Sequence, residues 1–163
     1  GNLIYKDAEG DTAYINGASP WLPYEPNPDY KNRATLGIIA VNDILYSRAV
    51  PDNFEINASM LAITGRVGID GIVLDDDGEV TAFNQLTDQW GRPISATFKK
   101  NSIRRLGGIT TFRRPVETVV KDGSIKSGFN IGQSSFDIGL LEGPPPFFLA
   151  YPTPRFFATT IVK

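Results

Sequence analysis

An alternation of side chains with a period of two residues constrains the fold of this chain more than any other feature. Within residues 35–69, one set of alternating small or apolar positions is Ile38, Ala40, Asn42 and Ile44, and eighteen positions later a second is Ile56, Ala58, Met60 and Ala62. A period of two is typical of β-strands, whose successive side chains point to opposite faces. The turn residues Pro51-Asp52-Asn53 separate the sets, which predicts strand, corner and strand with a repeat near eighteen residues.

A repeat of this length is that of one turn of a β-solenoid. Turns of a solenoid stack about 4.8 Å apart, so small inward side chains can align from turn to turn in a narrow interior. The 16 glycines and 12 prolines exceed a sixth of the 163 residues, which favours many turns over long helices. We therefore expect one all-β domain over 1–163, a β-solenoid resembling a right-handed β-helix. A β-sandwich would show similar alternation without the constant spacing.

Local turn signals predict several hairpins around this repeat. Asp75-Asp76-Asp77-Gly78 and Asp122-Gly123 each contain an Asp-Gly step between strand-like runs, and a polar loop at 7–11 separates two short strands at the start of the chain. Residues 84–98 are expected to leave the solenoid as a hairpin excursion. Gly107-Gly108 interrupts a strand from 103 to 112, which predicts a bulge or a close backbone approach.

Two Pro-rich segments are expected to cover the strands. Residues 18–33 combine four prolines with Trp21, Tyr24 and Tyr30, and predict an extended loop whose aromatic rings pack on the body of the fold. The end of the chain places Pro144-Pro145-Pro146 before large apolar residues, and predicts a cap on an exposed strand edge. The alternative is docking on a partner subunit through four aromatic residues, which are Phe147, Phe148, Phe156 and Phe157.

The absence of histidine and cysteine excludes several chemistries. With neither residue present, the chain has no Ser-His-Asp triad, no thiolate nucleophile, no disulfide and no cysteine-based metal centre. We predict no cofactor, no metal site and no catalytic residue. Calcium at Asp75–Asp77 is a weaker alternative, because the run lacks the alternate-position spacing of an EF-hand loop. A polysaccharide-active enzyme that uses carboxylates such as Asp43, Asp70 or Asp76 is a second alternative.

Charge is strongly segregated along the chain. Residues 1–91 hold 5 Lys or Arg against 14 Asp or Glu, a net charge of −9, whereas residues 92–126 hold 9 against 2, a net charge of +7. Such a basic segment can bind a polyanion, or the acidic part of the same chain can neutralise it. No apolar stretch approaches the roughly 20 residues that span a bilayer.

The run Ala34–Ile44, the segment Pro51–Ala62 and the distal Pro144–Phe148 resemble solenoid domains of unknown activity in pilus-associated, prepilin-like proteins. The segment Arg104–Ile109 and the ending Pro154–Phe157 are similar to the competence pseudopilins of type IV pili that serve natural transformation. The resemblance covers roughly residues 34–157. It implies an extracellular or periplasmic setting, other pilus subunits as partners, and contact with incoming DNA. It also suggests that the chain is a fragment whose N-terminal prepilin helix is missing, with Gly1 as a tag remnant.

The leading hypothesis is therefore a non-enzymatic structural and binding module of a pilus. Six basic residues would contact DNA phosphates, namely Lys99, Lys100, Arg104, Arg105, Arg113 and Arg114. Six such contacts would give a log–log salt dependence of about −5 with little sequence preference. Adjacent residues of a strand face opposite sides, so one member of each Arg-Arg pair is expected to pair within the chain. An architectural envelope protein that does not bind DNA is the alternative.

Overall fold

A computed structural model describes residues 1–15, 25–30, 35–95 and 97–137, together with Leu140, Pro145 and Phe148. These residues form an all-β structure whose sheets do not close into a barrel. Both parallel and antiparallel strand pairs occur. The all-β prediction is confirmed. Within the described ranges, no helix is long and apolar enough to cross a membrane.

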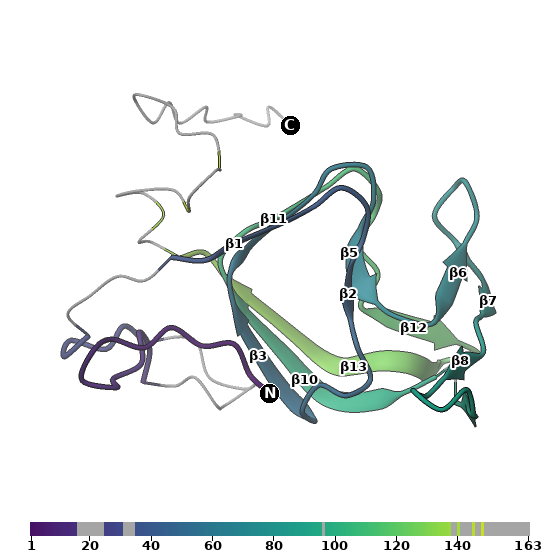
Figure 1. The fold of residues 1–163 in the computed structure, drawn as a ribbon, viewed down its shortest axis with the longest axis horizontal. Helices are drawn as coiled ribbons and strands as arrows, with labels where there is room; N and C mark the ends of the chain where they lie inside the picture. The colour runs from purple at the N-terminus through teal and green to yellow at the C-terminus, as the bar shows by residue number, and fades with distance from the viewer. Residues whose placement is uncertain are drawn as a thin grey trace.

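Parallel strands that are distant in the sequence lie side by side in three stacks. The first stack is β1 (Gly37–Ala40), β4 (Ser59–Ala62) and β11 (Ile109–Thr111). The second is β2 (Ile44–Tyr46) and β5 (Val67–Ile69), which Val116 joins through a parallel bridge to Gly68. The third is β3 (Asn53–Asn57), β10 (Lys99–Leu106) and β13 (Ser124–Ser135). In Figure 1 the three stacks form the sides of a triangular outline.

The register of the parallel pairs corrects the predicted repeat of eighteen residues. Ile38 pairs with Met60, and Ile44 pairs with Val67, so the first two layers are offset by 22 to 23 residues. The prediction was wrong because it treated residues 56–62 as one strand. The chain turns at Ala58, which lies between β3 and β4, so Ile56 belongs to a different stack from Met60. The alternation of side chains continues from Ile56 to Ala62 without a break, so the sequence pattern gives no sign of the corner.

Antiparallel hairpins project from the stacks. β6 (Ile72–Leu74) pairs with β7 (Val80–Phe83), β8 (Leu86–Thr87) pairs with β9 (Pro93–Ile94), and β12 (Thr118–Lys121) pairs with β13. The hairpins predicted at 75–78 and at Asp122-Gly123 are confirmed. The excursion begins earlier than the predicted residue 84, because β6 already pairs with β7 rather than with a stack. Asp122 and Gly123 have φ values of 53° and 69°, as a two-residue hairpin turn requires.

One loop design recurs at three hairpins. An aspartate begins each loop, a glycine with positive φ follows three positions later, and the aspartate Oδ1 accepts hydrogen bonds from the second and fourth amides after it. The three loops are Asp7–Asp11, Asp75–Glu79 and Asp88–Arg92. The first joins the antiparallel bridge between Lys6 and Thr12, consistent with the predicted N-terminal hairpin. The spacing Asp-x-x-Gly that these loops share is a sequence signal that identifies this loop.

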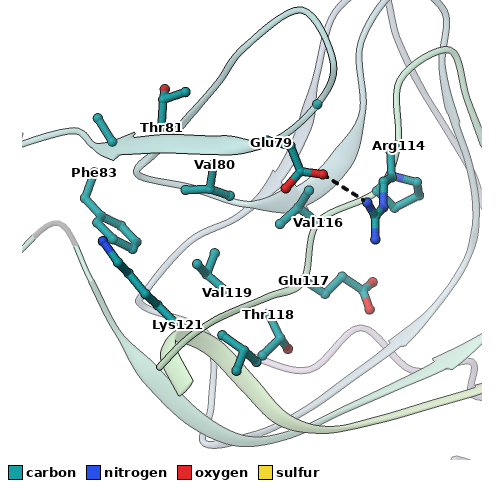
Figure 2. A pocket seen from close by; sticks show the side chains of 14 residues that line it. Glu79, Val80, Thr81, Phe83, Arg114, Val116, Glu117, Thr118, Val119 and Lys121 are labelled. Atoms are coloured by element: carbon teal, nitrogen blue, oxygen red, sulfur yellow. Dashed lines mark ion pairs between the residues drawn. The ribbon is translucent and has the colours of Figure 1, made fainter. Parts of the chain in front are cut away.

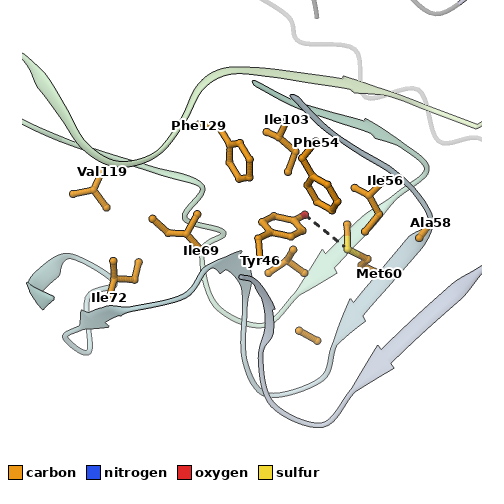
Figure 3. Packing of buried hydrophobic residues seen from close by; sticks show 12 residues of the cluster. Tyr46, Phe54, Ile56, Ala58, Met60, Ile69, Ile72, Ile103, Val119 and Phe129 are labelled. Atoms are coloured by element: carbon orange, nitrogen blue, oxygen red, sulfur yellow. Dashed lines mark hydrogen bonds between the residues drawn. The ribbon is translucent and has the colours of Figure 1, made fainter. Parts of the chain in front are cut away.

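The hydrophobic core lies between the three stacks. Tyr46 from β2, Phe54 from β3 and Phe129 from β13 form its aromatic centre, with the Tyr46 ring centroid 5.7 Å from that of Phe54 and 6.0 Å from that of Phe129 (Figure 3). The prediction of small inward residues is right for Ala58 and Ala62. It does not extend to the rest of the interior, which is wide enough to hold large rings in edge-to-face contact.

Glycine allows close packing at two positions near the ends of strands, against backbone at one and against side chains at the other. Gly107 lies between β10 and β11 with φ of 131°, and a Cβ at this position would collide with the carbonyl group of Ala58. The predicted close approach at Gly107-Gly108 is confirmed. Gly37 in β1 lies against Phe148 and Pro145, since a Cβ there would stand 2.9 Å from Phe148 Cδ2 and 3.0 Å from Pro145 Cβ.

Candidate functional site

The structure separates the six basic residues predicted to bind DNA. Arg104 is 2% exposed, donates through Nε to Gln133 Oε1 at 3.1 Å, and stands in register with the buried Glu55 of β3. Arg105 forms an ion pair with Glu117, and its Nε and Nη2 donate to Ser134 Oγ at 3.0 and 2.7 Å. Both arginines therefore make contacts within the chain.

The other four basic residues line different hollows, and three of them, Lys99, Arg113 and Arg114, are exposed. Lys100 Nζ lies 3.0 Å from Asp52 Oδ1, and Arg114 Nη1 lies 3.6 Å from Glu79 Oε1. Lys99 and Lys100 line one hollow, whereas Arg113 and Arg114 line two others. The six residues predicted to bind DNA therefore do not form one continuous basic surface among the described residues.

The hollow beside the start of β10 has the chemistry of an anion site. It has a volume of about 490 Å³, and its lining contains no carboxylate. Its lining residues are Lys99, Lys100, Asn101, Gly123, Ser124, Ile125 and Asn130. Ammonium, amide and hydroxyl groups are the donors that contact phosphate oxygens in nucleic-acid complexes. Asn101, Ser124 and Asn130 were not predicted as site residues. Asn101 is adjacent to Lys100 in β10, whereas Ser124 and Asn130 come beside the lysines through the pairing of β10 with β13.

A groove of about 500 Å³ lies between β7 and β12 (Figure 2). Val80 and Phe83 come from β7, while Val116 and Val119 come from the facing segment, and the ion pair of Glu79 with Arg114 lies at the wall. Within the described ranges, β7 pairs only with β6 and β12 only with β13. The groove is thus bordered by the outer strands of two sheets, which is a geometry that can accept an added strand.

Exposed apolar side chains form a column at one corner of the structure. Ala40, Ala62 and Thr111 are in register in the first stack, so the residues that follow them, Val41, Ile63 and Phe112, occupy corresponding positions. Their exposed fractions are 66%, 50% and 79%. The amides of Ile63 and Phe112 donate to the carbonyl groups of Ala40 and Ala62, which fixes the spacing of the layers at this corner. We call these three residues the apolar column.

The sequence could not reveal the apolar column. Each member is an isolated apolar residue at the end of a strand, and single exposed apolar residues are common. Only the stacking of β1, β4 and β11 brings residues 41, 63 and 112 together.

The predicted partner-docking aromatics fall mostly outside the described residues. Phe147, Phe156 and Phe157 belong to that part of the chain. Phe148 is half-buried and contacts Gly37 of β1, so part of its surface packs on the chain itself.

The carboxylates considered for catalysis or calcium lie at turns. Asp43 Oδ1 accepts from the Arg66 amide at 2.8 Å, Asp70 Oδ1 accepts from the Gly71 amide at 2.7 Å, and Asp76 is exposed in the β6–β7 loop. In the part of the chain that the structure describes, no three Asp, Glu, His or Cys residues gather where they could hold a metal ion. Asp75 uses its Oδ1 to close its own loop.

No protein-family model, no curated protein and no solved structure matches this chain. Functional inference therefore depends on the all-β fold and on the chemistry of its surfaces.

Proposed function

We propose that this chain is a non-enzymatic β-solenoid module that docks a protein subunit in a pilus-associated assembly at the cell surface. The solenoid is supported by offsets that agree, to within one residue, between different stacks for the same pair of layers. The first two layers are offset by 22 to 23 residues, the next by 48 to 49 (Gly68 with Val116, Met60 with Ile109), and the last by 29 (Lys99 with Gly128). Hairpins inserted between layers account for the larger offsets.

The docking role depends on the apolar column. Water-exposed apolar side chains that continue through several strands are typical of protein contact sites. The column runs along the stacking direction, so each layer adds one contact. A second copy of the chain is the simplest subunit to occupy it. The pilus setting is proposed from the motifs within residues 34–157 that resemble those of pilus-associated domains.

Sedimentation velocity over a range of protein concentrations tests the docking role. The wild-type protein should associate reversibly, and Phe112→Ser should raise the dissociation constant about 30-fold, because burying a Phe ring stabilises a contact by about 2 kcal/mol. Val120→Ser is the matched control, since Val120 is 61% exposed and lies outside the column. A protein that stays monomeric at every concentration, or a control that weakens association equally, would rule out homotypic docking through the column.

DNA binding at the hollow that contains Lys99 and Lys100 is a second candidate function. The observation that favours it is a lining of lysine, asparagine and serine without a carboxylate. Contacts of this kind hold the phosphate backbone without reading bases, which suits transport of DNA of any sequence. The number of cations available is smaller than the sequence predicted, because Arg104 and Arg105 are engaged within the chain and Lys100 is paired with Asp52.

A further inference from the structure

Arg66 carries a charged side chain that is almost completely buried. Only 4% of its surface is exposed, and its Nη1 and Nη2 each lie 3.3 Å from the carbonyl oxygen of Ile69, to which they donate. Gly68 provides the space, because a Cβ at this position would stand 2.5 Å from Arg66 Nη1. None of the ion pairs found among the described residues includes Arg66.

The positive charge of Arg66 is only partly balanced by its surroundings. Burial lowers the pKa of the guanidinium, and attraction to Asp43 and Asp70 offsets this lowering incompletely. Arginine nevertheless stays protonated at physiological pH. A buried charge without a matched partner costs free energy, and an anion that entered the site would recover part of it.

Arg66, the residue before β5, lines a pocket of about 220 Å³ that β6 also borders. Arg113 and Asn84 also line this pocket, and in the described part of the chain neither side chain donates to another residue. Asp43 is the carboxylate in the lining, and its Oδ1 is held by the Arg66 amide. Two guanidinium groups against one carboxylate leave the lining with a formal charge of +1.

We propose that this pocket binds a small oxyanion, a carboxylate, sulfate or phosphate group, with Arg66 as the deep contact and Arg113 and Asn84 as contacts at the rim. A guanidinium presents paired donors in a plane, which match two oxygens of such a group. The remaining lining consists of Ile72, Val73 and Leu74, the three residues of β6. This binding site is independent of the apolar column and of the hollow that contains Lys99.

The test is an NMR titration of protein with ¹⁵N-labelled arginine. Sodium sulfate, phosphate and acetate are added separately, and sodium chloride keeps the ionic strength constant. The Arg66 Nε resonance should shift and saturate with at least one oxyanion, whereas chloride should not produce a saturating shift. Saturation with acetate alone would identify a carboxylate ligand, and saturation with sulfate or phosphate would identify a sulfate or phosphate ester.

Two exposed neighbours provide matched variants. Arg113→Ala should weaken binding about tenfold, the size expected for one charge-assisted hydrogen bond. Arg114→Ala removes the same charge one residue away, outside the pocket, and should leave binding unchanged. The absence of a saturating Arg66 shift with all three oxyanions would overturn the proposal. An equal loss in both variants would also overturn it, since that result would indicate general surface attraction.

Discussion

Arg105 of β10 forms an ion pair with Glu117, the residue immediately before β12. The two side chains are 14% and 18% exposed, and Arg105 lies on the same side of its strand as the core residue Ile103. The pair therefore connects β10 to the segment that leads into the β12–β13 hairpin. Arg105, one of the six basic residues predicted to contact DNA, thus forms an ion pair that joins two parts of the fold.

Glu117→Gln should lower the free energy of unfolding by about 3 kcal/mol, because it leaves Arg105 mostly buried without its counter-charge. Urea denaturation measures this loss. Replacing both partners, as Arg105→Met with Glu117→Leu, should recover most of the stability. Glu79→Gln is the control, because Glu79 pairs with Arg114 on the surface with both side chains more than 70% exposed, and it should change stability by less than about 0.5 kcal/mol. Equal losses in Glu117→Gln and Glu79→Gln would contradict the buried role.

Tyr46 should make the protein sensitive to alkaline pH. Burial raises the pKa of its phenol to about 12, and Arg105 lowers it by a smaller amount. The unfolded chain releases this proton near pH 10, so stability is complete below pH 10 and falls as pH rises to 12, by about 2 to 3 kcal/mol. Tyr46→Phe should reduce this loss and have little effect at pH 7, since the one hydrogen bond of the hydroxyl to the described residues is a weak one, to Met60 Sδ at 3.8 Å. Urea midpoints at pH 8 and pH 11 measure both effects, and identical alkaline losses in the two proteins would refute the assignment.

Asp75→Ala should destabilise the β6–β7 hairpin by about 1 to 2 kcal/mol, because Oδ1 accepts hydrogen bonds from the amides of Asp77 and Glu79 at 3.1 and 2.8 Å. Amide hydrogen exchange of Glu79 should accelerate accordingly. Asp76→Ala removes the same charge from the same loop and should have little effect, as Asp76 is exposed. If Asp76→Ala accelerates exchange as much as Asp75→Ala, charge rather than loop closure is responsible.

DNA affinity, measured by gel shift across salt concentrations, should show a log–log slope of about −2, the value for two phosphate contacts. Lys99 supplies one contact, and Lys100 supplies the other by exchanging its ion pair with Asp52 for a phosphate. Lys99→Ala should bring the slope to about −1, while Lys121→Ala, which lies outside the hollow, should not change it. Arg104→Ala should lower stability instead of affinity, because Arg104 is buried. A slope near −5 would show that more cations reach the DNA than this structure exposes.

Local chemistry made part of the fold predictable. Asp122-Gly123 and Asp75–Gly78 define hairpins because the preferences of Asp and Gly for turn conformations act within a few residues. Alternation around Ile38 and Met60 likewise predicted strands, and Gly107 predicted a close backbone approach, because each signal depends on neighbours in the chain.

Which strands pair with each other, and in which register, was decided by the tertiary structure alone. The sequence favoured an offset of eighteen residues, but the corner at Ala58 makes it 22, and this choice depends on packing summed over Tyr46, Phe54 and Phe129 from distant segments. The same register brings Val41, Ile63 and Phe112 together and buries Arg104. A sequence determines where its chain extends and turns because those preferences are local. Which residues then become interior or surface depends on contacts between segments that are distant in the sequence. The free energy of these contacts is set by the complete arrangement of strands and cannot be read from any one segment.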